Sequence, residues 1–338
     1  MRLEKRGEAM EVLAKTYRGE LVDLVSWGTI VVVDSDGSIV YERGDAGESA
    51  YPRSSAKLMQ AMGGFSLGSL EKFSFTPEEV ATICASHSAE DFHLKAVRSI
   101  LAKIGLEERY LQCGAHYPYK LDVKEKMERE NEKATAIHNN CSGKHAGMLA
   151  SAVLLGEDPA TYLDLRSGAQ QAILDVMARL CEIKKEDIKI GIDGCSAPVH
   201  SMPIRNFAYG MARMTDRKNM PSDLAPYAEL ILNSMHAHAK YSSGSDRLDC
   251  YLMNRANERI VAKSGANGYY LVCFPERRQA LVVKCYQSEG IYRDRLVIEY
   301  LKKAGIIEKK DYAFFDECFD PKIYNHKKTV VGEIRCEL

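Results

Sequence analysis

The placement of strand-like segments along the chain is the feature that most restricts its fold. Runs rich in β-branched and aromatic residues stand near both ends of the chain, at residues 20–33, 38–41, 259–263, 269–274 and 279–285. Short polar turns join neighbouring runs, as in β-hairpins. Helical periodicity dominates between them, from about residue 54 to 250. The sequence therefore predicts an α+β fold, in which one antiparallel sheet takes strands from about residues 20–45 and 258–287 and helices flank it.

The chain has 338 residues and contains no internal repeat or low-complexity tract. We therefore expect a single domain over residues 1–338, with a core that buries ~75% of the unfolded surface. Residues 1–16 are interpreted as an additional N-terminal amphipathic helix. They lack the apolar stretch of a signal peptide. No apolar run in the chain approaches the ~20 residues that cross a bilayer.

The composition argues against several classes of partner. Lys and Arg total 46 against 47 Asp and Glu, for a net charge of −1. A nucleic-acid or anionic-membrane partner would require a basic surplus on some face of the protein. The ten cysteines are scattered and form no short-spaced disulfide framework. These features predict a soluble, cytoplasmic protein with reduced thiols.

Three short motifs occur in a suggestive order. Ser54 and Lys57 form an S-x-x-K at the start of a predicted helix, Ser86-His87-Ser88 lies on a loop, and Lys263-Ser264-Gly265 ends a predicted strand. The order S-x-x-K, S-D-N and K-T-G is the signature of penicillin-binding proteins and class A β-lactamases. The second and third motifs match that signature loosely. Each motif alone is common, but the three together favour a catalytic serine.

The chemistry explains why these residue types would occur together. A serine hydroxyl becomes a good nucleophile when a neighbouring base takes its proton. Residues i and i+3 share a helix face, so Lys57 can reach Ser54. A lysine acts as a base when burial and a second cation lower its pKa. Lys263 could be that second cation, or it could form a Ser86–Lys263 relay that returns the proton to the leaving amine.

A metal site is a weaker expectation from the residues alone. Residues 138–148 and 191–198 are rich in side chains that can bind metals, including Cys141 and Cys195. With a third donor, these two thiols could hold Zn²⁺. However, the spacing matches neither C-x-x-C nor H-E-x-x-H. Spacing alone favours the alternative that both cysteines are small buried hydrophobic residues.

Across most of its length, from about Tyr17 to Tyr286, the sequence resembles the class 3, rhizobial-type L-asparaginases. This family has a β-lactamase/penicillin-binding-protein-like fold. Several blocks in order carry the resemblance, and they are Pro52–Gln60, Cys84–Glu90, His138–Met148, Asp193–Pro198 and Ala262–Gly265. The resemblance implies hydrolysis of L-asparagine to L-aspartate and ammonia through an acyl-enzyme. It also implies a homodimer.

The resemblance also implies residue roles. Ser54 would be the nucleophile and Lys57 its base, and Ser86 and Lys263 would form a second Ser–Lys pair. Zinc would be bound by Cys141, Lys144 and Cys195, with a water held by Asp193. Arg53 and His145 would lie beside the substrate, where Arg53 could pair with a carboxylate.

Some segments depart from the family pattern. Trp27 occupies the first strand, and residues 235–239 and 245–249 follow the pattern only loosely. These segments can shape the pocket and with it the choice of substrate, so three alternatives stay open. One is an enzyme of the same fold acting on glutamine or a β-lactam, and another is a zinc hydrolase in which metal-bound water attacks. The third is a non-enzymatic thiol–zinc sensor built on Cys141 and Cys195.

Overall fold

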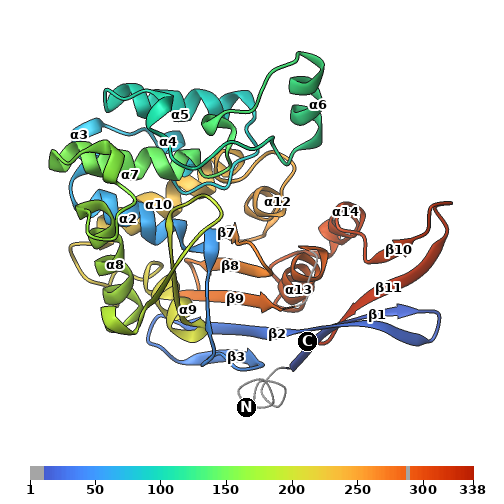
Figure 1. Ribbon diagram of the computed structural model, residues 1–338. Helices are drawn as coiled ribbons and strands as arrows, with labels where there is room; N and C mark the ends of the chain where they lie inside the picture. The colour runs from blue at the N-terminus through green and yellow to red at the C-terminus, as the bar shows by residue number, and fades with distance from the viewer. Residues whose placement is uncertain (1–10, 287–289) are drawn as a thin grey trace, which may run out of the picture.

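A computed structural model describes residues 11–286 and 290–338 (Figure 1). The described residues form an eight-stranded sheet with the order β10-β11-β1-β2-β9-β8-β7, and β3 pairs with β2. Each pairing in this sheet is antiparallel. The strands are β1 (Glu11–Arg18), β2 (Leu21–Asp34), β3 (Ile39–Arg43), β7 (Val261–Ser264), β8 (Tyr269–Phe274), β9 (Gln279–Cys285), β10 (Lys322–Tyr324) and β11 (Val330–Cys336).

The predicted α+β fold with a sheet from both chain ends is confirmed. The long strand β2 joins the two ends, because its second half pairs with β9 from Gly28↔Cys285 to Asp34↔Gln279. β7, β8 and β9 then follow as a meander. Their side chains are almost all buried, which explains the continuous apolar runs in this part of the sequence.

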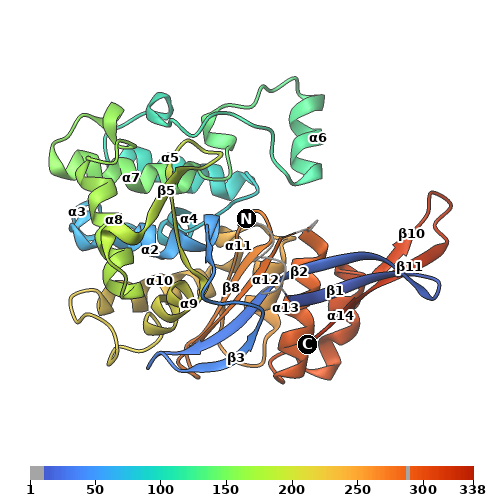
Figure 2. The same ribbon diagram turned by 60° about the horizontal axis from the view of Figure 1, so that its bottom comes forward.

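The predicted N-terminal helix is wrong over residues 11–16, which belong to β1; residues 1–10 lie outside the described part of the chain. β1 pairs with β2 on one side and β11 on the other. Strand pairing therefore outweighs the helix propensity of the local sequence. Strands β10 and β11 were not predicted either. Figure 2 shows β1, β2, β10 and β11 extending together from the body of the molecule.

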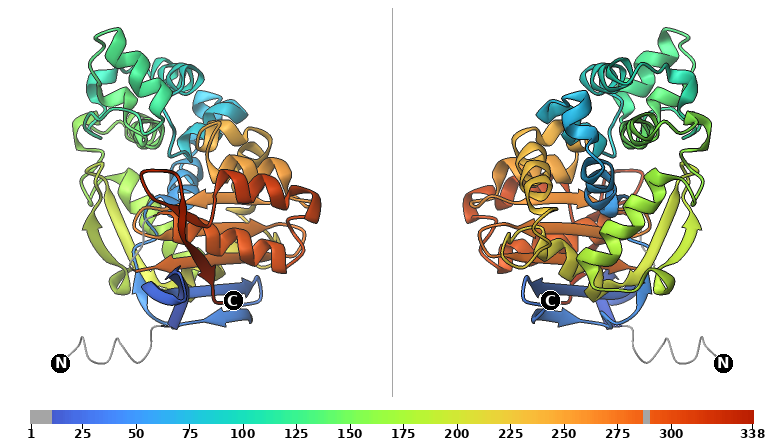
Figure 3. Two further views of the ribbon diagram at one scale, coloured as in Figure 1. Left: turned by 90° about the vertical axis from the view of Figure 1, so that its right-hand side faces the viewer. Right: turned by 90° about the vertical axis from the view of Figure 1, so that its left-hand side faces the viewer.

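Helices surround the sheet and form a separate layer beside it. They are α2 (Lys57–Ser66), α3 (Ser69–Phe73), α4 (Pro77–Ile83), α5 (Asp91–Lys103), α6 (Leu121–Arg129), α7 (Ser142–Leu155), α8 (Gly168–Cys181), α9 (Ile204–Arg213), α10 (Ala225–Ala237), α11 (Ala239–Ser242), α12 (Leu248–Arg255), α13 (Gly290–Lys303) and α14 (Tyr312–Cys318). α9 packs on β2, β8 and β9, and α13 contacts β8, β9, β1 and β11. Figure 3 shows the cyan and green helices at one end of the molecule and the blue and orange strands at the other.

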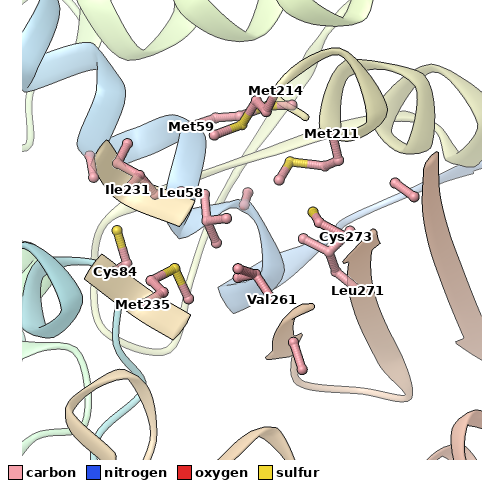
Figure 4. Packing of buried hydrophobic residues seen from close by; sticks show 14 of the residues in the cluster. Leu58, Met59, Cys84, Met211, Met214, Ile231, Met235, Val261, Leu271 and Cys273 are labelled. Carbon is pink, nitrogen blue, oxygen red and sulfur yellow. The ribbon is translucent and has the colours of Figure 1, made fainter. Parts of the chain in front are cut away.

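Helix α2 lies at the centre of the helical layer, and nine tenths of its residues are buried. A glycine is required at Gly63, because a Cβ there would lie 2.8 Å from Ile173 of α8. The α2 side chains Leu58 and Met59 belong to the apolar core between the helices and the sheet, and Figure 4 shows part of this core. The amino end of this buried helix is therefore held rigidly.

A small second sheet lies beside the helical layer, with the order β4-β6-β5. Its strands are β4 (Ser49–Ala50), β5 (Lys189–Ile192) and β6 (Pro198–Pro203). The turn between β5 and β6 carries Asp193 and Cys195. Among the described residues, no helix is long and apolar enough to cross a membrane.

Candidate active site

A cleft of about 300 Å³ lies where the amino end of α2, the loop after α4 and the end of β7 meet. Its lining includes Ser54, Ser86, Ser264, Gly265, Arg247 and Arg293. The structure thus brings residues of all three sequence motifs to the same cleft, although the motifs span more than 200 residues of the chain. An open cleft with convergent polar groups is typical of a small-molecule site.

Ser54 lies in the short 3₁₀-helix η1 (Arg53–Ala56), directly before α2. The preceding Arg53 has a positive φ of 53°, a conformation that costs a non-glycine residue free energy and that clusters at functional sites. Within the described residues, the Ser54 hydroxyl has no hydrogen bond, and the amide N–H groups of Ser54 and Ala266 have no acceptor. Free amides beside a serine are suited to stabilising an oxyanion.

Lys57 is buried, and its amine joins three segments of the chain. Lys57 Nζ donates to the Ala85 carbonyl at 2.5 Å and to Ser86 Oγ at 3.0 Å, and it lies 3.2 Å from Cys141 Sγ. The predicted partner of Lys57 was Ser54, but the hydroxyl that it contacts here is that of Ser86. Lys57 therefore connects Ser86 of the cleft with the Cys141 thiol behind it.

Lys263 lies behind Ser264 and is fully buried. Its amine donates to the Ser264 carbonyl at 2.8 Å and lies 3.6 Å from Asp249 Oδ2. Burial lowers the pKa of Lys263 to about 7, helped by the charge of Lys57 and opposed by Asp249. Within the described residues, Lys263 makes no direct hydrogen bond to Ser86, so the expected Ser86–Lys263 pair is not joined by one. A lysine with a pKa near neutrality is nevertheless suited to proton transfer.

Asp249 is a charged partner of this site that sequence reasoning missed. It is 1% exposed and accepts hydrogen bonds from Ser264 N at 3.0 Å, Ser264 Oγ at 2.9 Å and Tyr270 OH at 2.7 Å. Burial raises the pKa of Asp249, but Lys263, Arg247 and these hydrogen bonds outweigh it and bring the pKa to about 2. No local signal marks it, because its role depends on α12 packing against β7.

The predicted metal ligands also come together. Cys141 lies at the amino end of α7, Lys144 in its first turn, and Cys195 in the turn between β5 and β6. Lys144 Nζ lies 3.0 Å from Cys195 Sγ. A hydrogen bond from Cys195, together with the charges of Lys57 and Lys144, lowers the pKa of the Cys141 thiol well below its usual range, although burial opposes the shift. The cluster therefore favours one thiolate at Cys141.

The chemical types of these three donor atoms are compatible with Zn²⁺. Two sulfur atoms and a nitrogen are donors that Zn²⁺ accepts, provided that the amine gives up its proton. Burial lowers the pKa of Lys144 and so favours loss of its proton, but the neighbouring Cys141 and Cys195 raise that pKa. Considering only His, Cys, Asp and Glu, the described part of the chain contains no group of three that could hold a metal. A metal at this cluster therefore depends on Lys144.

The three predicted substrate-binding residues lie outside the lining of the cleft. Arg53 Nε donates to Asp193 Oδ1 at 2.9 Å, so the two residues pair with each other. His145 is fully buried, and its Nδ1 lies 2.6 Å from Tyr162 OH, whereas its Nε2 has no partner within the described residues. Burial lowers the pKa of His145 well below its usual range. The arginines that do line the cleft are Arg247 and Arg293.

Comparison with known proteins assigns the chain to a family. The sequence model of L-asparaginase II matches residues 14–336. The chain therefore belongs to the L-asparaginase II family. That membership supports an L-asparaginase-like amidohydrolase that acts on a small molecule. Among curated proteins, none matches the chain.

Several solved structures share features of the chain trace at low sequence identity. A class C β-lactamase from Rhodobacter sphaeroides is 12% identical, with a TM-score of 0.43 over 82% of this chain and 94% of that one. A β-lactamase from Mycobacterium bovis is 10% identical, with a TM-score of 0.42 over 90% of this chain and 99% of that one. Mglu in its glutamate form is 11% identical, with a TM-score of 0.43, and the match spans 82% of this chain and 60% of Mglu.

Proposed function

We propose that the protein hydrolyses the side-chain amide of L-asparagine to L-aspartate and ammonia, with Ser54 as the nucleophile. The observation that carries this proposal is the joint placement of Ser54 and Ser86 in one cleft, with the Lys57 amine 3.0 Å from Ser86 Oγ. A buried amine in this position can exchange protons with a hydroxyl of the cleft. Membership of the L-asparaginase II family supports the side-chain amide of L-asparagine as the proposed substrate group.

In the proposed mechanism, Ser54 Oγ attacks the amide carbon while neutral Lys57 takes the hydroxyl proton. The N–H groups of Ser54 and Ala266 stabilise the oxyanion of the tetrahedral intermediate. The C–N bond then breaks, and Ser86 and Lys263 pass a proton to the departing nitrogen, which leaves as ammonia. Water hydrolyses the β-aspartyl ester of Ser54, and L-aspartate is released.

The direct test of the proposed function is ammonia release from L-asparagine, L-glutamine and a β-lactam control by the purified protein. We expect kcat/KM to be highest for L-asparagine. A preference for L-glutamine, or opening of the β-lactam ring, would keep the serine mechanism and change the substrate. No turnover of any of them, with zinc binding that changes on oxidation, would favour the thiol–zinc sensor.

We also propose that Cys141, Lys144 and Cys195 hold one zinc ion per chain, beside the Arg53–Asp193 pair. When bound, zinc would supply positive charge that helps to place polar groups of the substrate. Ser54 already supplies the nucleophile. The ion is therefore expected to contribute to binding more than to bond cleavage.

Removal of zinc by a chelator is expected to raise KM for L-asparagine about tenfold and to change kcat by less than about threefold. Elemental analysis of the protein as purified should show zinc, and Cys195→Ser should lower its content, because this change removes one thiol donor. Loss of kcat at unchanged KM would contradict this role. It would point instead to attack by metal-bound water.

A further inference from the structure

Arg247 lines both the cleft of Ser54 and a second hollow beside it. This second hollow has a volume of about 400 Å³ and is lined by Asp246, Leu248 and Asp294, among other residues. Arg247, Ser264 and Arg293 line both spaces. These three residues therefore lie between the two spaces, where they could contact a part of a ligand that extends from Ser54 toward the second hollow.

The two arginines of this junction differ in their partners. Arg293 donates through Nε to Asp294 Oδ1 at 2.8 Å and through its NH1 group to the Gly265 carbonyl at 2.8 Å. The Arg247 side chain is partly buried and has neither an ion pair nor a hydrogen bond within the described part of the chain. A guanidinium that has lost part of its hydration without gaining a partner is costly, unless a ligand supplies one.

Two of the carboxylates near Arg247, Asp249 and Asp294, are already committed to other groups, and the third, Asp246, is exposed to solvent. Asp249 accepts its hydrogen bonds from Ser264 and Tyr270 and pairs with Lys263, and Asp294 pairs with Arg293. The charge of Arg247 therefore interacts with Asp249 and Asp294 only at longer range, and within the described residues its guanidinium has no hydrogen-bonded carboxylate. Helix α12 begins at Leu248, directly after Arg247, and the positive end of its dipole adds to the same local potential. An anion is the ligand that this potential favours.

We propose that Arg247 binds the carboxylate of the substrate, so that the enzyme acts on small amides that carry a carboxylate group. This inference rests on the proposed function, because it assumes that the reacting amide lies at Ser54. Guanidinium and carboxylate can form two parallel hydrogen bonds, which orient the substrate as well as hold it. The Arg53 guanidinium, which was expected in this role, is paired with Asp193.

The kinetic test compares two substrates that differ only in the carboxylate. They are L-asparagine and L-aspartic acid diamide, in which a neutral amide replaces the α-carboxylate. Arg247→Gln is expected to raise KM for L-asparagine at least about tenfold, with kcat within about threefold and KM for the diamide within about twofold. Arg247→Lys should recover part of the loss, because it restores the charge without the planar fork.

A binding experiment separates failure of this inference from failure of the proposed function. Calorimetric titration with L-aspartate requires no turnover, and Arg247→Gln should raise its Kd at least about tenfold. The control is Arg217→Gln, which removes an exposed guanidinium that pairs with Glu229, and it should behave as the wild type. Equal Kd values for Arg247→Gln and wild type, or no binding by the wild type, would overturn the inference. The inference would also be overturned if Arg247→Gln raised KM equally for L-asparagine and the diamide. It would likewise be overturned if Arg53→Gln raised KM for L-asparagine and Arg247→Gln did not.

Discussion

Ser54→Ala is expected to lower kcat for ammonia release from L-asparagine by about 10⁴-fold or more. The hydroxyl of Ser54 faces the cleft, and Ser86 is the neighbour that would have to replace it. Ser86 is already bonded to Lys57 Nζ, and it lies on a different loop from the free amide of Ser54. Ammonia release under single-turnover and steady-state conditions measures the loss.

The matched control is Ser66→Ala, at the carboxyl end of the same helix. Its hydroxyl donates to the Gly63 carbonyl at an exposed site, far along α2 from Ser54, so activity should stay within about twofold of the wild type. Melting temperatures of both variants establish that the fold is intact. Ser54→Ala with more than about a tenth of the wild-type kcat would contradict a serine nucleophile and favour attack by zinc-bound water.

The second large effect is expected in the pH dependence of kcat/KM. Burial lowers the pKa of Lys263 to about 7, so the neutral amine is scarce at pH 5 and abundant above pH 7. In the proposed relay the Lys263 amine must accept a proton before it can pass one to the departing nitrogen, so kcat/KM should rise about 50-fold between pH 5 and pH 7 and level off above about pH 8. The buried His87 and His145 are not expected to contribute, because burial holds their pKa values well below the usual range.

Asp249→Asn tests which group produces this rise. The negative charge of Asp249 favours protonated Lys263, so its removal lowers the pKa of Lys263 and should move the midpoint of the profile to lower pH. Asp246→Asn removes an exposed carboxylate three residues earlier in the chain and should leave the midpoint in place. A midpoint that stays near 7 in Asp249→Asn would assign the titration to another group.

The main sheet illustrates what a periodic pattern can predict. The strands near residues 20–33 and 259–285 were predictable because β8, β9 and the second half of β2 are buried on both faces and form nearly continuous apolar runs. β1, β10 and β11 escaped prediction because charged residues interrupt their apolar pattern and many of their side chains are partly or fully exposed. β1 and β11 pair with each other across almost the whole length of the chain, and local sequence contains no information on that pairing.

The candidate site divides in the same way. Ser54, Ser86 and Ser264 belong to short motifs whose spacing and order follow from the chemistry of a serine nucleophile. Asp249 and Arg247 belong to no motif, and an acidic and a basic residue near a helix start are ordinary features of a surface. The burial of Asp249 beside Lys263 and the position of Arg247 in the lining of the cleft are what make them significant.

The sequence alone decides the class of fold and the types of reacting groups, since these depend on local periodicity and on the residues present. The tertiary structure decides which groups meet. It places Lys57 against Ser86, pairs Arg53 with Asp193, and leaves the Arg247 side chain at the cleft with no hydrogen bond or ion pair to any described residue. The physical reason is that hydrogen bonds and ion pairs act over a few ångströms, and only the packing of distant segments sets such distances.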